Sequence, residues 1–360
     1  MAMNSSGPIS LGGTTSGQSI ETQLGGSGTT TISLNCINVR NLAGVATGQI
    51  TMPTNFYSKS VNSIGIFYGG LDRSNSAINT VTRFNICGSP IGCQTSAGLA
   101  NYNVVGSFVG CNGLFYAGVS STSTPTNNVT RINRCGSLVG SITTAGAVKS
   151  AGTIGGGPTL SNNGVFLGSN NTGCLYTNVV TRINACGALF GSETYTGNIC
   201  CRTYTVASAG ATVGPNGLFY SLPYCSCYNK NLVKRINACG ALVGSITTIG
   251  NSETRFMAGA AVGSYGIFYG GTQYPSNTIV NCSVKINACG AQVGSIYNIG
   301  FARSSLGGAK VGIIGLFFGG AYSGGAFGSQ IITRINVCNA QVVSEMGFGT
   351  GVRDLGGAGT

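Results

Sequence analysis

Residues 64–70 read Ile-Gly-Ile-Phe-Tyr-Gly-Gly, and residues 82–88 read Thr-Arg-Phe-Asn-Ile-Cys-Gly. Both phrases recur, six times in all along the 360-residue chain, and a Val-Gly-Ser-like phrase follows the second. The Phe of the first phrase stands at Phe67, Phe115, Phe166, Phe219, Phe268 and Phe317. The Cys of the second stands at Cys87, Cys135, Cys186, Cys239, Cys289 and Cys338. Successive copies are 48 to 53 residues apart, which matches one four-stranded blade of a β-propeller and exceeds the common helical repeats.

Turn signals divide each repeat into four short strands. Asn-Gly pairs precede the Phe-Tyr strand at residues 112–113, 163–164 and 216–217, where a two-residue type I′ hairpin needs positive φ. In the fifth repeat this predicts strand one at residues 256–263 and strand two at 267–269. Strand three carries Val-Thr-Arg-Ile-Asn, and strand four carries Gly-Ala-Leu-Val-Gly-Ser-Ile-Thr. Because no segment combines helical apolar spacing with a cap, the sequence predicts an all-β fold.

The two ends of the repeat region complement each other. The first repeat opens at residue 61 with its second strand, whereas residues 351–359 match the strand-one phrase of residues 302–309. We therefore expect the C-terminal segment, with Arg353, Leu355 and Ala358, to supply the missing strand and leave no open edge. The predicted architecture is a six-bladed β-propeller over residues 61–360, closed by the C-terminal strand. Residues 1–60 form a separate N-terminal module, too polar and short to hold much core alone.

The composition argues against catalysis. The chain has no His and six acidic residues, Glu21, Asp72, Glu193, Glu253, Glu345 and Asp354, which lie far apart in sequence. General acid–base chemistry, paired-carboxylate hydrolysis and most metal sites draw on these residue types. We therefore expect a protein that is not an enzyme, with no cofactor, no catalytic residues and no metal.

The charge and hydropathy of the chain limit the classes of partner that it is expected to have. A net charge of +12 favours an anionic partner or surface, although a chain that is merely short of acids would carry the same charge. The cations are spread at one or two per repeat without a dense patch, so nucleic acid is not expected as a partner. No apolar run approaches the ~18 residues that span a bilayer, and no signal peptide is evident. We therefore expect the protein to be made in the cytoplasm and not to insert into a membrane.

Two resemblances add to this interpretation. Residues 61–360 resemble kelch repeats through the Gly-Gly after strand two and the Arg before strand one at Arg202, Arg255, Arg303 and Arg353. They depart from kelch in having Arg-Ile-Asn-x-Cys where that family usually has a Tyr and a later Trp. Residues 1–60, with segments such as 4–13 (Asn-Ser-Ser-Gly-Pro-Ile-Ser-Leu-Gly-Gly) and 52–57 (Met-Pro-Thr-Asn-Phe-Tyr), look like the N-terminal segment of many tailed-phage structural proteins. That resemblance implies a virion protein, made in the host cytoplasm, whose first 60 residues bind other virion proteins.

Two repeated residue types are candidate sites. Strand three repeats a cation at Arg83, Arg131, Arg182, Arg235, Lys285 and Arg334. The six acids cannot pair with all of these and with the other cations too, so we expect most of the six to bond backbone carbonyls or face water, with a ring of anion-binding sites as the alternative. The six repeated cysteines are expected to be small buried hydrophobes, too far apart for disulfides. Cys200, Cys201, Cys225 and Cys227 are expected to be loop cysteines, and a disulfide or a four-thiolate metal site is the alternative.

These observations leave three classes of function. The leading hypothesis is a phage tail-fibre or tail-appendage propeller that displays a host-adhesion surface, with a host glycan or protein as its receptor. Its contacts would lie in the loops that vary most among repeats, at residues 120–128, 221–231 and 321–330. The candidate contact residues are Thr124, Asn127, Tyr224, Tyr228, Tyr322 and Phe327. The alternative is a decoration or cement protein of the head, tail or baseplate. An enzyme on a propeller is disfavoured by the missing His and clustered carboxylates, and homo-oligomerisation is left open.

Overall fold

The computed structural model describes residues 63–148, 157–171, 176–198, 205–223, 231–249, 253–322, 328–342 and 346–360. Before residue 63 it describes scattered positions, namely 6–12, 18–20, 33–34, 39, 43, 49–52 and 55. The ordered elements of these residues are β-strands, so the all-β prediction is confirmed. Six of the sheets in this part of the chain are four-stranded and antiparallel. We number them 1 to 6 in chain order.

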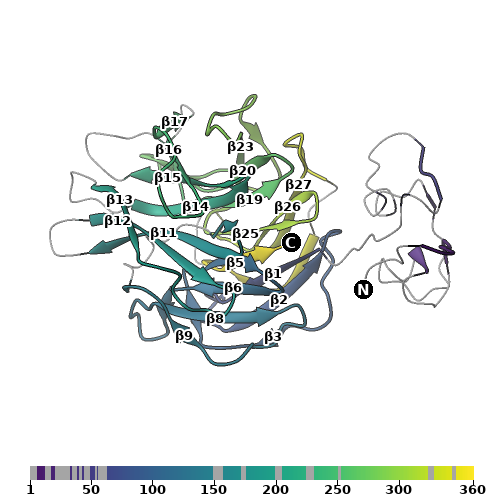
Figure 1. Cartoon of the computed structure of the whole chain (residues 1–360), viewed down its shortest axis with the longest axis horizontal. Coiled ribbons are helices and arrows are strands. Elements are labelled where there is room, and N and C mark those ends of the chain that lie inside the picture. Colours follow the sequence, from purple (N-terminus) through teal and green to yellow (C-terminus); the bar gives the residue numbers. More distant parts are fainter. Residues whose placement is uncertain are drawn as a thin grey trace.

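The strands of each four-stranded sheet run outward from a first strand near the middle of the molecule (Figure 1). They follow sequence order in sheets 2 to 6, whereas sheet 1 begins with the C-terminal strand of the chain. The first strands of sheets 1 to 6 are β29 (Gly356–Gly359), β5 (Val105–Val109), β10 (Thr159–Leu160), β14 (Thr205–Val213), β19 (Ala258–Val262) and β25 (Gly307–Val311). The second strands are β1 (Ile64–Tyr68), β6 (Asn112–Tyr116), β11 (Asn163–Asn171), β15 (Asn216–Pro223), β20 (Tyr265–Tyr269) and β26 (Ile314–Phe318).

The third strands are β2 (Thr80–Asn85), β8 (Asn128–Asn133), β12 (Tyr176–Asn184), β16 (Asn231–Ile236), β23 (Cys282–Ile286) and β27 (Ser329–Ile335). The fourth strands are β3 (Thr95–Ser96), β9 (Thr143–Thr144), β13 (Thr194–Asn198), β17 (Thr247–Ile249), β24 (Tyr297–Asn298) and β28 (Met346–Val352). Two smaller sheets pair β4 (Asn101–Tyr102) with β7 (Val119–Ser120), and β21 (Thr272–Tyr274) with β18 (Glu253–Arg255) and β22 (Thr278–Ile279).

The C-terminal strand completes sheet 1. β29 pairs antiparallel with β1, and the register sets Ala358 opposite Ile66. Leu355, immediately before this strand, is buried with Val311, Leu316 and other residues of sheet 6. The chain ends of the repeat region therefore share one sheet, and that sheet contacts its neighbour in the chain order.

The Phe-Tyr step holds neighbouring sheets together. The Tyr of one sheet packs against the Phe of the next, with ring centroids 5.2 Å apart for Tyr68 and Phe115 and 5.1 Å apart for Tyr116 and Phe166. Sheets 4 and 5 and sheets 5 and 6 repeat this contact. Phe318, which stands at the Tyr position of sheet 6, lies 5.4 Å from Phe67 of sheet 1. The same aromatic contact thus also joins the last repeat to the first.

Glycine at the middle of the first strands lets these strands approach closely. A Cβ on Gly259 would lie 2.6 Å from the carbonyl oxygen of Gly210, and one on Gly308 would lie 2.4 Å from that of Gly259. A Cβ on Gly357 would lie 2.5 Å from the carbonyl oxygen of Gly308, and one on Gly106 would lie 2.5 Å from that of Gly357. Real Cβ atoms do not approach oxygens so closely, so any side chain here would push the sheets apart.

Two details of the predicted repeat are wrong. The hairpin between strands one and two does not turn at the Asn-Gly pair, because Val109 pairs with Asn112 and leaves Gly110-Cys111 as the turn. Gly110 has φ of 61°, and Gly at the first central position is the type II′ choice. Strand four is also shorter than predicted, since Leu189 makes an isolated bridge with Ile183 and β13 begins only at Thr194.

The described positions before residue 63 contribute a small apolar cluster. Ile20, Val39 and Ala43 are buried in it, with Ile9, Leu11, Leu34, Ile50 and Met52 partly buried around them. These residues belong to no cluster of the sheets. The division of the chain at residue 60 stays a prediction.

Candidate interaction surfaces

One end of the sheets carries the same turn six times, and we call it the constant end. Each strand three finishes in Asn-x-Cys-Gly, except that Asn339 replaces the Gly in sheet 6. The Asn side-chain oxygen accepts the backbone N–H groups two and four residues later, at 2.9–3.1 Å in every sheet. This Asx-type turn needs a left-handed residue at its fourth position, where Gly187 has φ of 81° and Asn339 has φ of 60°.

The repeated cations lie between neighbouring sheets at this end. Arg83 donates to the carbonyl of Arg134 at 3.1 Å, and Lys285 donates to that of Val337 at 3.3 Å. Arg182 reaches the carbonyl of Ala238 at 3.5 Å. Each acceptor is the second residue of the Asn-x-Cys-Gly turn in the next sheet. Three of the six predicted cations therefore bond backbone carbonyls, and all but Arg334 keep part of the side chain exposed.

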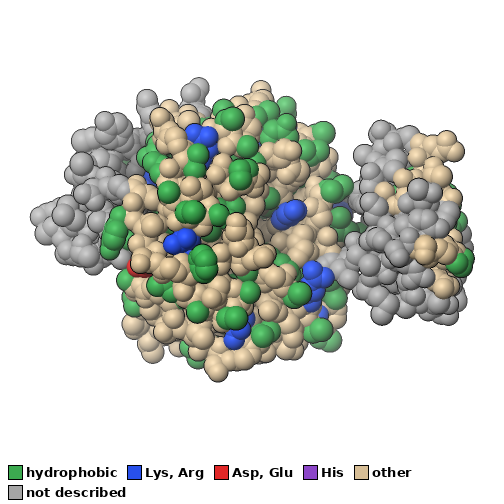
Figure 2. All heavy atoms as spheres, in the orientation of Figure 1, with side chains coloured by type: hydrophobic (Ala, Val, Ile, Leu, Met, Phe, Trp, Pro, Cys, Tyr) green, Lys and Arg blue, Asp and Glu red, His purple; other side chains and the backbone are tan. Residues whose placement is uncertain are grey.

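The remaining cations share this position. Arg131 and Arg235 lie against the turn glycine of the next sheet, because a Cβ on Gly187 or Gly290 would lie 3.3 Å or 3.4 Å from their side chains. Arg334 lies against Gly88 in the same way, at 3.1 Å, and burial lowers the pKa of its guanidinium. The structure thus places all six along the joins between sheets. Figure 2 shows Lys and Arg side chains scattered singly over one face, without a dense basic patch.

Threonine hydroxyls add a second link across each join. Thr143 of sheet 2 donates to the carbonyl of Gly187 in sheet 3 at 2.7 Å. Three other sheets repeat the bond at 2.8 Å, from Thr95 to Gly136, Thr194 to Gly240 and Thr247 to Gly290. At these joins the preceding sheet therefore contacts the turn through both a cation and a Thr hydroxyl. We call this pair of contacts the clasp.

The prediction that the repeated cysteines are buried is wrong. Cys135, Cys186, Cys239, Cys289 and Cys338 are exposed thiols, and Cys87 is half-buried beside the Arg334 guanidinium. The turn explains the error, because it uses only the backbone N–H of the cysteine, as in Cys135 to Asn133. Cys200, Cys201, Cys225 and Cys227 lie outside the described residues.

The opposite end of the sheets carries loops that differ from repeat to repeat, and we call it the variable end. Loops 69–79, 117–127, 270–281 and 319–328 connect strands two and three there. Of the predicted contact residues, Thr124 is exposed, whereas Asn127 donates to the carbonyl of Gly146 at 2.6 Å and serves the loop itself. Tyr322 is half-buried and accepts a bond from Ser329 at 3.3 Å. Tyr224, Tyr228 and Phe327 lie outside the described residues.

A chain of left-handed residues surrounds the middle of the variable end. Asn103, Phe256, Ser305 and Asp354 have φ between 53° and 58° and stand just before the first strands of four sheets. Their backbones are linked in sequence, because Ser305 donates to Phe256, Asp354 to Ser305 and Asn103 to Asp354 at 2.7–3.0 Å. Asn103, Ser305 and Asp354 line one opening, that of the central cavity described below. In the sequence, each of these residues stands three positions before the strand-one Gly.

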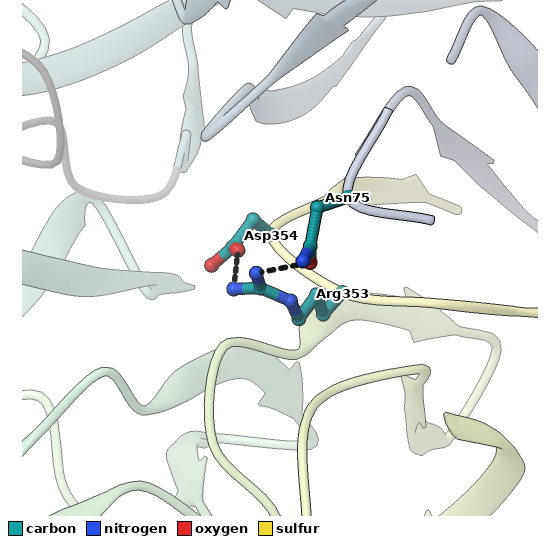
Figure 3. A network of polar contacts seen from close by, with 3 residues as sticks. All are labelled: Asn75, Arg353 and Asp354. Carbon is teal, nitrogen blue, oxygen red and sulfur yellow. Dashed lines mark hydrogen bonds and ion pairs between the residues drawn. The ribbon is translucent and has the colours of Figure 1, made fainter. Parts of the chain in front are cut away.

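A network at the chain junction supports this opening (Figure 3). Arg353 donates 2.8 Å bonds to the Asp354 carboxylate and to the side chain of Asn75, which lies in the loop of sheet 1. The Asp354 side chain is 12% exposed, and its burial raises the carboxyl pKa while Arg353 opposes the rise. Of the predicted closing residues, Arg353 therefore ties the last strand to the first loop, and Leu355 and Ala358 are buried.

Two hollows lie in the described part. A central cavity of about 390 Å³ is lined by the first strands of all six sheets, with Asp354 and Asn103 at the variable end and Lys310 and Thr360 among the other lining residues. A cleft of about 280 Å³ lies between the loops of sheets 1 and 2 at the variable end. Its lining is formed by Leu71, Asn75, Ser76, Ala77, Tyr102, Ser121 and Ser123. The sequence did not predict either hollow, since each depends on how separate sheets face one another.

Two of the described acids accept hydrogen bonds from loops and strands around them. Asp72 accepts the backbone N–H groups of Ser74 and Ser76 in its own loop. Glu193, just before β13 of sheet 3, accepts the Thr181 hydroxyl at 2.7 Å. Within the described residues, no three His, Cys, Asp or Glu side chains form a group that could hold a metal ion.

Comparisons with known proteins leave these surfaces unassigned. None of the protein-family models matches the chain, and no curated protein matches it significantly. Among the described residues, no helix has the length and apolar character needed to cross a membrane. The resemblances to kelch repeats and to phage structural proteins therefore rest on the motifs alone.

Proposed function

We propose that the six sheets are the blades of a closed, kelch-like β-propeller carried on a tailed-phage virion. Support for closure comes from the pairing of β29 with β1 and from the aromatic contact between Phe318 and Phe67. Residues 1–60 would bind other virion proteins, in keeping with their resemblance to phage structural segments. A cryo-electron micrograph average with six blades around a central channel is the expected result, and an open arc of sheets would contradict closure.

We infer further that the variable end of the propeller is a host-adhesion surface of a tail fibre or tail appendage. The observation that carries this inference is the contrast between the two ends. One end repeats a single turn, whereas the other carries loops of different sequence around a cleft. Binding specificity is normally placed in such loops on a rigid scaffold. A host cell-surface glycan or protein is the expected receptor, and no chemical step is required of the chain.

The cleft between the loops of sheets 1 and 2 is the first place to test. Tyr102 offers a half-exposed aromatic ring there, and Asn75, Ser76, Ser121 and Ser123 offer donors and acceptors. We expect full-length protein to compete with phage adsorption to host bacteria, and Tyr102→Ala with Ser121→Ala to weaken that competition. Leu189→Ser at the constant end is the control and should compete like the unchanged protein. Equal competition by all variants would count against the cleft.

A purely architectural role as a decoration or cement protein is the second candidate. The constant end favours it, because exposed apolar side chains gather near the turns of sheets 2 to 4. These residues are Leu138, Leu189, Phe190, Leu242 and Ile246, each 36–47% exposed. Such a surface suits packing against a neighbouring protein. Virions that lack the protein should lose stability in this case, and they should lose adsorption but keep stability if adhesion is the function.

A further inference from the structure

Three positions of the Asn-x-Cys-Gly turn have a structural task at the constant end. The Asn side chain closes the turn, and the Gly supplies both positive φ and the carbonyl that the preceding Thr bonds. The second residue of the turn packs under the hairpin of the preceding sheet. A Cβ on Gly263 would lie 3.1 Å from a methyl of Val337, and one on Gly312 would lie 2.8 Å from a methyl of Ile86. The Cys contributes its backbone N–H, which any residue except proline could supply.

The cysteine nevertheless persists where its neighbours change. In sheet 6 the Gly of the turn is Asn339, whose side chain bonds Ser283 instead. In sheet 5 Lys285 replaces the Arg, and Tyr297 stands at the position of the bonding Thr. The clasp thus tolerates substitution at three of its parts, while the thiol is retained in all six repeats. Its side chain is exposed in five sheets, so packing does not account for it.

The five exposed thiols occupy equivalent places in consecutive sheets. They are Cys135, Cys186, Cys239, Cys289 and Cys338, and we call them the thiol arc. Cys87 is left out of the arc because it is half-buried beside Arg334. Since the same Asx-type turn carries each of these cysteines, the thiols lie together at one end of the molecule. Within the described residues the arc forms no metal-holding group of three.

We propose that the constant end is a self-association surface on which the thiol arc of one copy forms disulfides with the arc of a second copy. A partner that pairs with several thiols of the arc at once must present thiols in a matching arrangement, and a second copy turned over does so. Such a face-to-face contact is isologous, the usual form of a two-fold dimer. Leu138, Leu189 and Leu242 follow three arc cysteines at the same offset and are 36–39% exposed. They supply apolar surface beside the thiols.

The chemistry is thiol–disulfide exchange with a small-molecule disulfide as oxidant. An arc thiolate attacks the disulfide of oxidised glutathione, forms a mixed disulfide and releases one glutathione thiol. An arc thiolate of the second copy then attacks the protein sulfur of the mixed disulfide and releases the second glutathione thiol. Two protein thiols have been oxidised, one glutathione disulfide has been reduced to two thiols, and the protons are carried by the products.

The test uses reduced full-length protein incubated with oxidised glutathione. We expect a covalent dimer on non-reducing gels and by intact mass, reversible with dithiothreitol, whose linked peptides contain arc cysteines. A variant with all five arc cysteines changed to Ser should lose the dimer. Cys93→Ser, an exposed cysteine outside the repeated turn, is the matched control and should dimerise like the unchanged protein.

Two measurements keep the proposal open to contradiction if the five-fold variant does not fold. Alkylation of the native, unchanged protein should label the arc thiols before the buried Cys282 and should abolish later dimer formation. Leu189→Ser with Leu242→Ser should slow dimer formation without changing the alkylation rate. Arc thiols that carry glutathione but never link two copies would overturn the proposal, as would a dimer whose disulfides map elsewhere. Neither outcome bears on adhesion at the variable end.

Discussion

A buried lysine offers the sharpest test of the packing described above. Lys234 lies on β16 in sheet 4 and is 4% exposed. The equivalent positions hold Thr82, Thr130, Thr181 and Thr333, and Val284 in sheet 5, all of them buried. A lysine here takes a charge out of water where other repeats have a small side chain, and its burial lowers the pKa of Lys234 from 10.5 to about 8.

The sign and size of the effect follow from this pKa. Below pH 8 the lysine is charged in both states, and the folded state bears the full cost of burying the charge. A displacement of about 2.5 pKa units corresponds to about 3 kcal/mol, at about 1.4 kcal/mol per unit. The cost declines as pH rises from 8 toward 10.5, because the unfolded chain then binds more protons than the folded one.

Lys234→Met removes the charge and keeps most of the volume. We expect the free energy of unfolding in urea, measured under reducing conditions, to rise by about 3 kcal/mol at pH 7 and by about 1.5 kcal/mol at pH 9.5. Lys310→Met, at an exposed lysine on β25, should change it by less than about 0.5 kcal/mol at both values. A gain that does not shrink with pH, or a loss at pH 7, would refute the assignment of a buried charged lysine.

Three further substitutions test the joins between sheets. Thr143→Val should lower the free energy of unfolding by about 1 kcal/mol because it removes the 2.7 Å bond to the Gly187 carbonyl, and the exposed Thr144→Val should leave it unchanged. Gly187→Ala should lower the free energy of unfolding by about 2 kcal/mol, since its Cβ would lie 2.9 Å from the Thr143 hydroxyl. Gly214→Ala also has positive φ but would meet nothing within 4 Å, so it should lower the free energy of unfolding by less in the same urea titration. Leu355→Ala should cost about 2–5 kcal/mol by emptying the buried site at the chain junction, and an unchanged melting temperature would argue that this junction contributes nothing to the fold.

The sequence predicted the parts of the fold that depend on the repeat. The period, the buried Phe-Tyr strand and the strand-one phrase at the C-terminus are all patterns within one chain, and the structure has β29 beside β1. The position of the hairpin turn was wrong because Gly-Cys-Asn-Gly at residues 110–113 contains two turn signals. The choice between them is made by strand register, which sets Val109 opposite Asn112. A two-residue difference of this kind cannot be decided from turn preferences alone.

The candidate sites were less accessible to sequence reasoning, for a different reason. Cysteine is among the residues most often buried, and that tendency led to the prediction that the repeated thiols lie inside. The Asx-type turn overrides the tendency because Asn133 captures the N–H of Cys135 and leaves its side chain outside. The two hollows depend on residues from separate sheets, such as Asn75 of sheet 1 and Ser121 of sheet 2 in the cleft. Local patterns carry no information about such contacts between distant segments.

The contrast between the two ends explains how one repeat can serve two surfaces. At the constant end, each turn is fixed by an Asn, a left-handed Gly or Asn and contacts from the preceding sheet, so its sequence has little freedom. At the variable end, the loops join strands whose register is already set by the buried Phe-Tyr strand. Their sequences can therefore differ without disturbing the joins, as loops 117–127 and 270–281 do. If this reasoning is correct, exchanging those two loops should alter binding to cells while leaving thiol-linked dimer formation unchanged, and a simultaneous loss of both would show that the ends are not independent.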